Sequence, residues 1–211
     1  MLLKRSLVTI SLIKSDITII KNVDIIVTSS NELLQGNKNT SYWRFNGRMN
    51  VDGAVREALN QKTLDIDLKG KILKPGESCI STSSGKILEN NVKYIIHTVV
   101  PDGAYGRSKS DEVFSNCYSS CLELAESHHA KSIGFPALGC GIKEWNTAKA
   151  AEVAFLSIVK KAKTMQSVDE INFVFKDVNV LNTFKLVGCK LGLTYDEKDI
   201  GENDKYSFKI Q

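Results

Sequence analysis

The sequence has little of what marks membrane, disulfide-rich or zinc-binding proteins. No apolar stretch reaches the length of a membrane-spanning helix, which predicts a soluble protein. The apolar run in residues 1–13 is broken by Thr9 and Ser11 and lacks a small-residue cleavage site, so we interpret it as a first strand instead of a signal peptide. The five cysteines have no CxxC spacing and no neighbouring histidine cluster, which excludes a zinc ribbon and is typical of a reduced, intracellular chain.

Proline and clustered charge are also scarce. Only three prolines occur in 211 residues and no stretch has the composition of a linker, so one domain is expected over residues 1–195. The polar tail, residues 196–211, would be an edge extension or disordered. The formal net charge of +4 is spread along the chain without a long Lys/Arg run, which favours a positive pocket over a nucleic-acid groove. With 42% hydrophobic residues, the chain can bury one substantial core.

Apolar, β-branched runs alternate with segments of helical periodicity. Strands are expected at residues 6–13, 24–29, 78–83, 92–100, 131–135 and 170–175, with a further β-rich segment at 18–20. Helices are expected at residues 51–60, 110–125, 146–163 and 178–191. The turn at Ser84-Gly85 separates two strands that should pair as neighbours. This order predicts a layered α/β domain with a largely parallel sheet. In such sheets ligands bind beyond the carboxyl ends of the strands, where we expect Asn31, Pro136 to Ile142 and Phe175.

A glycine-rich loop follows one of these strands. Residues 131–145 run from the strand through Gly139 and Gly141, and Asn146-Thr147 then opens a helix. Glycines let the backbone approach a ligand closely, and the start of a helix offers unpaired N–H groups, so the pattern favours an anionic group, most often phosphate. The alternative is that the glycines only form a turn.

Five sequence blocks, in order, resemble the macro domain family. Residues 15–17, SDI, are similar to the family's Gly-Asp-Ile, and residues 23–31, VDIIVTSSN, to its Val-Asp-Ala-Ile-Val-Asn-Ala-Ala-Asn. Residues 50–55, NVDGAV, resemble the end of its Gly-Gly-Gly-Val-Asp-Gly-Ala-Ile loop, and residues 94–101, YIIHTVVP, its Val-Ile-His-Thr-Val-Gly-Pro strand. Residues 132–142, SIGFPALGCGI, resemble its Ser-Ile-Ala-Phe-Pro-Ala-Ile-Ser-Thr-Gly-Val.

The resemblance covers residues 14 to 180 and implies both a fold and a ligand. The implied fold is a three-layer α/β/α sandwich with a central, mostly parallel mixed sheet. The implied partner is ADP-ribose or an ADP-ribosylated protein, whereas nucleic acid and membranes are not expected partners and no metal or other cofactor is implied. We expect a monomer in the cytoplasm, with the nucleus as the alternative location.

The resemblance also implies which residues bind the adenine and which bind the distal ribose. Asp16 would accept a hydrogen bond from the adenine amine while the Ile17 N–H donates to the ring; a carboxylate cannot donate, so it selects adenine over guanine. The alternative for Asp16 is a turn cap. Phe175 would stack on the adenine face, or else belong to the core. Asn31 would bind hydroxyls of the distal ribose, because an amide both donates and accepts.

Main-chain amides of two facing loops would hold the diphosphate without a charged side chain. The amides implied for the diphosphate are those of Gly139, Cys140, Gly141 and Ile142 in the loop after the strand at 131–135, with Val51 and Gly53 helping from the opposite loop. Pro136, Leu138 and Lys143 are further ligand-binding residues implied in the first of these loops.

Asp52 is the residue on which the hypothesis of catalysis depends. In hydrolytic members of the family the matching aspartate lies beside the distal ribose. Asp52, with Asn31, would orient or deprotonate a water that attacks the anomeric carbon or an ester of ADP-ribose. The implied substrates are ADP-ribosylated Asp or Glu side chains, or O-acetyl-ADP-ribose. The alternative is that Asp52 is only a helix N-cap.

Departures from the family pattern keep two other functions open. Lys143 stands where many hydrolases of the family have Phe or Tyr, so a reader that binds ADP-ribose without cleaving it is one alternative. An insertion within residues 37–50 carries Lys38, Arg44 and Arg48 among aromatic residues, and it would form a lid or a nucleic-acid-binding surface.

Several reactive residue types have structural interpretations. His97 lies inside an apolar strand and is predicted to be a buried structural histidine. Cys140 has no partner base nearby in the sequence and is not predicted to be a nucleophile. Cys117 and Cys121 fall on the apolar face of one helix with no histidine, which favours packing over metal binding.

Overall fold

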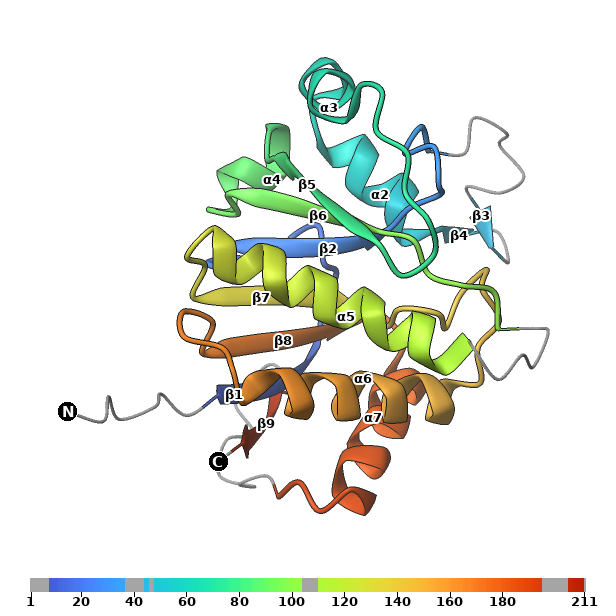
Figure 1. Cartoon of the computed structure of the whole chain (residues 1–211), viewed down its shortest axis with the longest axis vertical. Helices are drawn as coiled ribbons and strands as arrows, with labels where there is room; N and C mark the ends of the chain where they lie inside the picture. The colour runs from blue at the N-terminus through green and yellow to red at the C-terminus, as the bar shows by residue number, and fades with distance from the viewer. Residues whose placement is uncertain (1–7, 37–43, 46–47, 104–109, 195–204, 211) are drawn as a thin grey trace.

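The fold is built on a single large sheet. A computed structural model describes residues 8–36, 44–45, 48–103, 110–194 and 205–210, and there a seven-stranded sheet has the order β5-β6-β2-β7-β8-β1-β9 (Figure 1). The strands are β1 Val8–Lys14, β2 Ile25–Ser29, β5 Ser78–Thr82, β6 Tyr94–Thr98, β7 Ser132–Pro136, β8 Glu170–Phe175 and β9 Lys205–Ile210. The strands from β6 to β1 pair in parallel, whereas β5 and β9 are antiparallel at the edges. The predicted mostly parallel, mixed sheet is confirmed, as is the pairing of β5 with β6.

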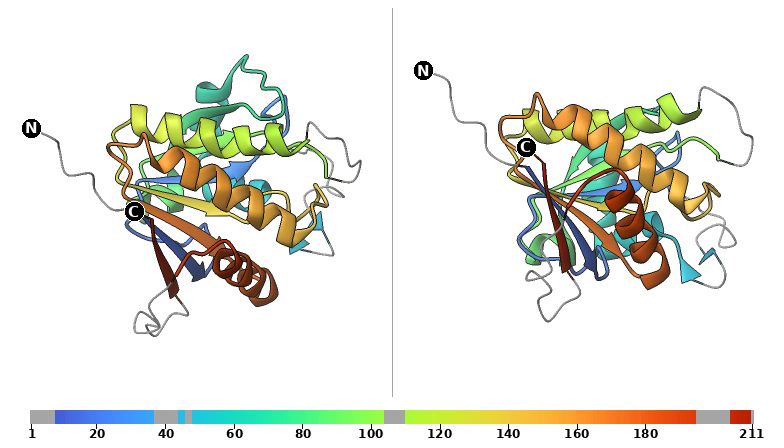
Figure 2. Two further views of the ribbon diagram at one scale, coloured as in Figure 1. Left: turned by 60° about the horizontal axis from the view of Figure 1, so that its bottom comes forward. Right: turned by 90° about the horizontal axis from the view of Figure 1, so that it is seen from below.

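Helices cover both faces of the sheet. On one face lie α5 Ser110–Ser127, α6 Thr147–Ala162 and α7 Val178–Lys190, with α5 and α6 side by side (Figures 1 and 2). On the other face lie α2 Val51–Ala58, α3 Gln61–Leu68 and α4 Gly85–Glu89. The first group buries Phe114, Phe155 and Phe184 in one core cluster, and the second buries Val55 and Leu64 in another. The α/β/α arrangement is therefore confirmed.

The strands that position the site are buried on both faces. Ile25, Ile26 and Val27 of β2, and Ile133 and Phe135 of β7, are all 0% exposed. Such apolar, largely β-branched runs are typical of the central strands of parallel sheets. Because these strands are parallel, their carboxyl ends meet at one edge of the sheet, where the chain continues into the candidate site.

One expected extended segment is a turn. Residues 18–20 are β-branched in composition, yet the Thr18 N–H donates to Asp16 Oδ1 at 3.0 Å. This local hydrogen bond competes with strand pairing and overrides the β propensity.

The region between β2 and β6 holds more helix than the sequence pattern predicts. The helix expected at residues 51–60 ends at Ala58, and α3 follows after Asn60, whose side chain accepts from the Lys62 N–H at 3.0 Å. The turn expected at Ser84-Gly85 leads into the short helix α4. A helix of five residues is too short to show periodicity in the sequence.

The polar tail and the insertion each contribute strands. Residues 205–210 form β9, which pairs with β1 and places Phe208 in the core. In the insertion, β3 Arg44–Phe45 and β4 Arg48–Met49 pair with each other. The lid and nucleic-acid interpretations depend on residues, Lys38 among them, that lie outside the described part of the chain, or on side chains that it does not describe.

In the described ranges, no helix is both long and apolar enough to cross a membrane, and no group of His, Cys, Asp or Glu is placed to hold a metal ion. Cys117 and Cys121 of α5 are both buried in the core, as predicted.

Candidate functional site

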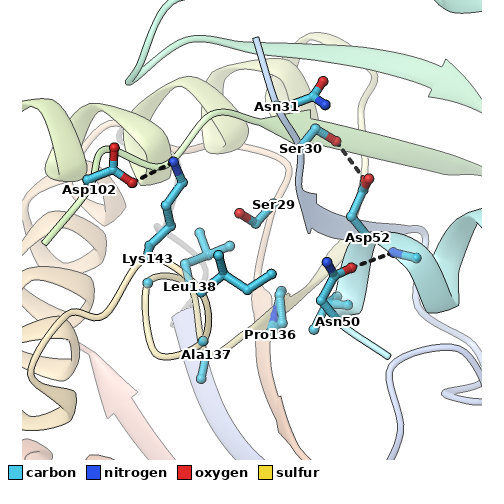
Figure 3. A pocket seen from close by; sticks show the side chains of 15 residues that line it. Ser29, Ser30, Asn31, Asn50, Asp52, Asp102, Pro136, Ala137, Leu138 and Lys143 are labelled. Carbon is cyan, nitrogen blue, oxygen red and sulfur yellow. Dashed lines mark hydrogen bonds and ion pairs between the residues drawn. The ribbon is translucent and has the colours of Figure 1, made fainter. Parts of the chain in front are cut away.

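A cavity of about 350 Å³ opens at the carboxyl edge of the parallel strands (Figure 3). The end of β2, the start of α2, the segment after β6 and the loop after β7 all contribute to it. Its lining residues are Ser29, Ser30, Asn31, Asn50, Val51, Asp52, Gly53, Asp102, Pro136, Ala137, Leu138, Gly139, Gly141, Ile142 and Lys143. The volume lies in the range of small-ligand pockets, roughly 300–1,000 Å³.

This cavity gathers most of the residues predicted for the site. It brings together Asn31, Val51, Asp52, Gly53, Pro136, Leu138, Gly139, Gly141, Ile142 and Lys143. Four predicted residues are not in its lining: Asp16, Ile17, Cys140 and Phe175.

The first turn of α2 has N–H groups without an acceptor in the part of the chain that the structure describes. Asn50 is the N-cap, because its Oδ1 accepts from the Gly53 N–H at 2.7 Å. The alternative that Asp52 caps this helix is therefore wrong. Within the described residues, no acceptor is recorded for the N–H groups of Val51 and Asp52, and a helix start carries the positive end of its dipole. The cavity therefore favours an anion at this wall.

The loop after β7 forms the facing wall. Leu138 N–H donates to Pro136 O at 2.8 Å and Cys140 N–H to Ala137 O at 3.2 Å, which closes a tight turn. The Cys140 amide is thus already paired with Ala137 O, and its predicted contact with the diphosphate stays a prediction. The N–H groups of Gly141 and Ile142, by contrast, have no recorded acceptor in the described part of the chain.

Asp52 is held by three donors. Its Oδ1 accepts from Ser30 Oγ at 2.8 Å and Thr28 Oγ1 at 3.3 Å, and its Oδ2 forms an ion pair with Arg56 Nε at 2.8 Å. Asp52 is 8% exposed and Arg56 4% exposed, and Arg56 also donates through Nη2 to Leu34 O at 2.8 Å. The charge of this buried carboxylate is balanced, and its orientation is fixed.

His97 extends this network as a neutral donor. Burial, and then the positive charges of Arg56 and Lys71, lower its pKa to about 3. The Ser30 hydroxyl gives its proton to Asp52, so at 3.3 Å it can only accept from His97 Nδ1–H. His97 Nε2 then accepts from Ser81 Oγ at 2.9 Å. The prediction of a buried structural histidine is confirmed, and its ring supports the serine that positions Asp52.

Acid is expected to destabilise the fold through His97. The pKa of His97 is about 3 in the folded chain, whereas its ordinary value is 6.5. Between pH 3 and pH 6.5 the unfolded chain therefore binds a proton on His97 that the folded chain does not bind. The contribution of neutral His97 to the free energy of unfolding is then fully present above pH 6.5. It falls as the pH drops from 6.5 to 3, by up to about 1.4 kcal/mol per pH unit. Urea unfolding across this range measures the slope. His97→Asn should flatten it, because the substituted side chain does not titrate in this range. An unchanged slope in His97→Asn contradicts this origin.

Asn31 lies at the mouth of the cavity with part of its amide in use. Its Nδ2 donates to Gly36 O at 2.9 Å and its Oδ1 accepts from the Gln35 N–H at 3.3 Å. Gly36 has φ 65°, and a Cβ there would lie 2.9 Å from Cδ and Nε of Arg56, so this turn requires glycine. The exposed amide of Asn31 keeps one donor and one acceptor position for a ligand hydroxyl.

Comparison with known proteins identifies the family. The sequence matches the family model of the Macro domain over residues 39–154, more than half of the chain. The chain belongs to the macro domain family. It is 32% identical to a macro domain-containing protein of Streptomyces griseus, over 84% of this chain and 93% of that protein. It is also 32% identical to an O-acetyl-ADP-ribose deacetylase of Salmonella gallinarum, over 80% of this chain and 87% of that protein.

A solved structure supports the same assignment. The Oceanobacillus iheyensis macrodomain with ADP is 25% identical and superposes with a TM-score of 0.70, covering 87% of this chain and 92% of that one. The predicted family and fold are confirmed.

In this macro domain the residues predicted to read adenine lie outside the cavity lining. Asp16 forms an ion pair with Lys176 and accepts from both the N–H and the hydroxyl of Thr18, at 3.0 and 2.9 Å. Partial burial raises the pKa of Asp16, but the hydrogen bonds from Lys176 and Thr18 outweigh burial and lower it. The turn-cap alternative describes Asp16 here. Its reading of adenine, together with the buried Ile17, stays a prediction.

Phe175 is a core residue in this structure. Its ring is 2% exposed and packs against Phe184, with ring centroids 4.8 Å apart, and against Phe173. Stacking on adenine needs an exposed ring face, so the packing in this structure favours the core alternative, and the stacking role stays a prediction.

Cys140 is poorly suited to nucleophilic chemistry. Burial raises the pKa of its thiol to about 11, although a hydrogen bond with Thr147 opposes this. The thiolate is the reactive form, so at neutral pH the side chain is inert.

Several lining residues were not predicted. They are Ser29, Ser30, Asn50 and Asp102, whereas Ala137 lies within the stretch Pro136 to Ile142 that was expected at this edge. The sequence did contain a hint of the two serines. The family motif has two alanines directly before the residue that matches Asn31, and this chain has Ser29 and Ser30 in their place. Asp102 directly follows the fourth resembling block, but only the structure shows that it contacts Lys143, at 2.8 Å.

Proposed function

We propose that this macro domain binds ADP-ribose and hydrolyses ADP-ribosyl esters, releasing ADP-ribose and a carboxylate. The proposal rests on one observation: main-chain N–H groups that have no acceptor among the described residues line one cavity from facing sides, at the start of α2 and in the loop after β7. Such groups bind phosphate oxygens without a charged side chain. The relatives support this ligand, since one is an O-acetyl-ADP-ribose deacetylase and another holds ADP.

Asp52 would orient the attacking water. A carboxylate offers about four acceptor positions, and Ser30, Thr28 and Arg56 occupy three of those on Asp52. The remaining position would hold a water beside the distal ribose, which Asn31 would bind through its hydroxyls. The water oxygen bonds to the anomeric carbon as the ester C–O bond breaks. The electron pair leaves with the carboxylate, and the water's proton passes to solvent.

A reader that binds ADP-ribose without cleaving it is the second candidate. It is favoured by the ion pair between Asp52 and Arg56, because the guanidinium already occupies one oxygen of the carboxylate. It is also favoured by Lys143 in place of an aromatic residue. Turnover separates the two candidates, because both require ADP-ribose binding.

Asp52→Asn is expected to lower the turnover of a glutamate-linked ADP-ribosyl peptide roughly 100-fold or more, because the amide replaces one acceptor oxygen with a donor. The Kd for ADP-ribose, measured by calorimetry, should change by less than about threefold, since the diphosphate is held by main-chain groups.

Wild-type titrations with AMP and ADP provide the controls. Binding of AMP as tight as that of ADP-ribose would contradict the diphosphate site. Tight ADP-ribose binding without turnover in the wild type would favour the reader. Full turnover in Asp52→Asn would remove this residue from the mechanism.

A further inference from the structure

A second cavity, of about 640 Å³, is lined by the ion-pair partner of Asp52. Asp52 lines the first cavity and Arg56 lines the second, so their buried ion pair lies between the two. The other walls come from the segment after β2, from α3 and from the segment after α3. The Leu73 N–H donates to Glu32 O at 2.9 Å, which ties these two segments together. The second cavity is thus a separate feature of the fold, bounded by anchored chain.

Positive charge predominates around the second cavity. Arg56, Lys69 and Lys71 line it, against one acidic residue, Asp65. In the part of the chain that the structure describes, no carboxylate forms an ion pair with Lys69 or Lys71. Lys71 Nζ has one long contact, 3.5 Å from Ile80 O. The charges of the lining therefore favour a ligand that carries a carboxylate or another anionic group.

Arg56 has donors left for such an anion. A guanidinium carries five N–H groups. Nε donates to Asp52 and Nη2 to Leu34 O, and among the described residues no acceptor is recorded for Nη1. Arg56 and Lys71 both lower the pKa of His97, so the two positive charges act on the same region of the molecule. An anion that enters the second cavity can bind both.

The remaining lining is apolar and favours a peptide over a nucleic acid. Leu34 and Leu68 are buried, whereas Leu33 and Ile72 are 54% and 69% exposed. Exposed apolar side chains next to cations can contact the side chains of a peptide as well as its charge. No described residue of the lining is aromatic, so a nucleic-acid base would have no ring on which to stack.

One short loop joins the two cavities. Asn31 lines the first cavity and would bind the distal ribose, and residues 33–35 line the second. The Leu34 N–H donates to Asn31 O at 3.0 Å, so the loop turns back on itself. Four residues span at most roughly 14 Å of extended chain. A peptide joined to the distal ribose can therefore reach the second cavity with a side chain about four residues from the modified one.

We propose that the second cavity binds the peptide that carries ADP-ribose, through an acidic residue within about four positions of the modified one. This inference rests on the ADP-ribose binding of the proposed function, and it does not require hydrolysis. Arg56 and Lys71 receive the carboxylate, and Leu33 and Ile72 contact apolar side chains beside it. The sequence around the modified residue then contributes to affinity, whereas free ADP-ribose uses the first cavity alone.

The test measures the Kd of ADP-ribosyl peptides by calorimetry. The peptides are joined to ADP-ribose through glutamine, because an amide nitrogen in place of the ester oxygen separates binding from ester hydrolysis. One peptide has glutamate at the second and fourth positions on each side of the linkage, and the other has glutamine there. The wild type should bind the glutamate peptide roughly 5- to 10-fold more tightly.

Charge reversal in the second cavity should invert this preference. In the double variant Lys69→Glu with Lys71→Glu, the glutamate peptide should bind no more tightly than the glutamine peptide. A peptide with lysine at the same positions should bind more tightly than either. The Kd for free ADP-ribose should stay within about twofold of the wild-type value, since neither lysine lines the first cavity, and this also shows that the variant is folded.

Lys62→Glu with Lys74→Glu is the matched control. It changes the net charge by the same amount, at two exposed positions near α3 that are outside the lining of both cavities. This double variant should keep most of the wild-type preference for the glutamate peptide.

Three results overturn the proposal. Equal binding of the glutamate and glutamine peptides by the wild type, with tight binding of free ADP-ribose, overturns the second site alone. A preference that survives in the cavity variant, or that is lost equally in the control, also overturns it, because the charges of this cavity would not be the cause. A wild type that does not bind free ADP-ribose is a failure of the proposed function itself, and the peptide site falls with it.

Discussion

Replacing Arg56 by alanine is expected to lower the free energy of unfolding by about 3–5 kcal/mol. The guanidinium is 4% exposed and is the only cation paired with Asp52 in the described part of the chain, so its removal leaves a buried carboxylate without compensation. The hydrogen bond to Leu34 O is lost as well. Urea denaturation, monitored by tryptophan fluorescence, measures the change through the shift of the midpoint.

Two further variants identify the cause of this loss. Asp52→Asn in the Arg56→Ala background removes the unpaired charge, so the double variant should be more stable than Arg56→Ala alone. Lys161→Ala breaks a partly exposed pair with Glu123 and should cost about 0–1 kcal/mol. A loss below about 1 kcal/mol in Arg56→Ala would contradict the buried-charge explanation.

Gly141→Val is expected to abolish ADP-ribose binding while leaving the fold intact. A Cβ at Gly141 meets nothing within 4 Å, and its φ is outside the left-handed region, so unfolding should change by less than about 0.5 kcal/mol. The added side chain would stand in the cavity between the two sets of N–H groups. We expect the Kd to weaken at least 100-fold, about 2.8 kcal/mol, by calorimetry.

Gly139→Ala gives the opposite pattern and serves as the matched comparison. Gly139 has φ 81°, and a Cβ there would lie 3.0 Å from Phe114 Cζ and from Trp145 Cδ1. The left-handed backbone alone costs an alanine about 1–2 kcal/mol, so this variant should lose stability. Near wild-type ADP-ribose affinity in Gly141→Val would show that the diphosphate does not lie against this loop.

The sheet and its central strands follow from local pattern. Apolar runs such as Ile25 to Val27 are long and β-branched enough to indicate buried strands, and Asn146 correctly marks the start of α6. Helix α3 was missed although Leu64 and Leu68 have helical spacing, because the polar residues around them hid the signal. Residues 18–20 were misjudged because one side-chain hydrogen bond of Asp16 outweighed β propensity.

The site was predicted less completely, because its members come from segments far apart in the chain. Phe175 shows the difficulty. Side chains alternate along a strand, so Phe175 shares the face of Phe173, and helix α7 covers that face. Which face a helix covers cannot be read from the strand alone.

The sequence by itself determined the family, the layered α/β plan and the place of the glycine loop after β7, since these rest on ordered motifs and on periodicity along one stretch of chain. Only the tertiary structure decided how the charges are paired: Asp52 with Arg56, Ser30 and Thr28 in a buried network, and Lys143 with Asp102 at the mouth. The physical reason is that hydrogen bonds and ion pairs act over about 3 Å, so they depend on which strand ends and loops the completed sheet brings together.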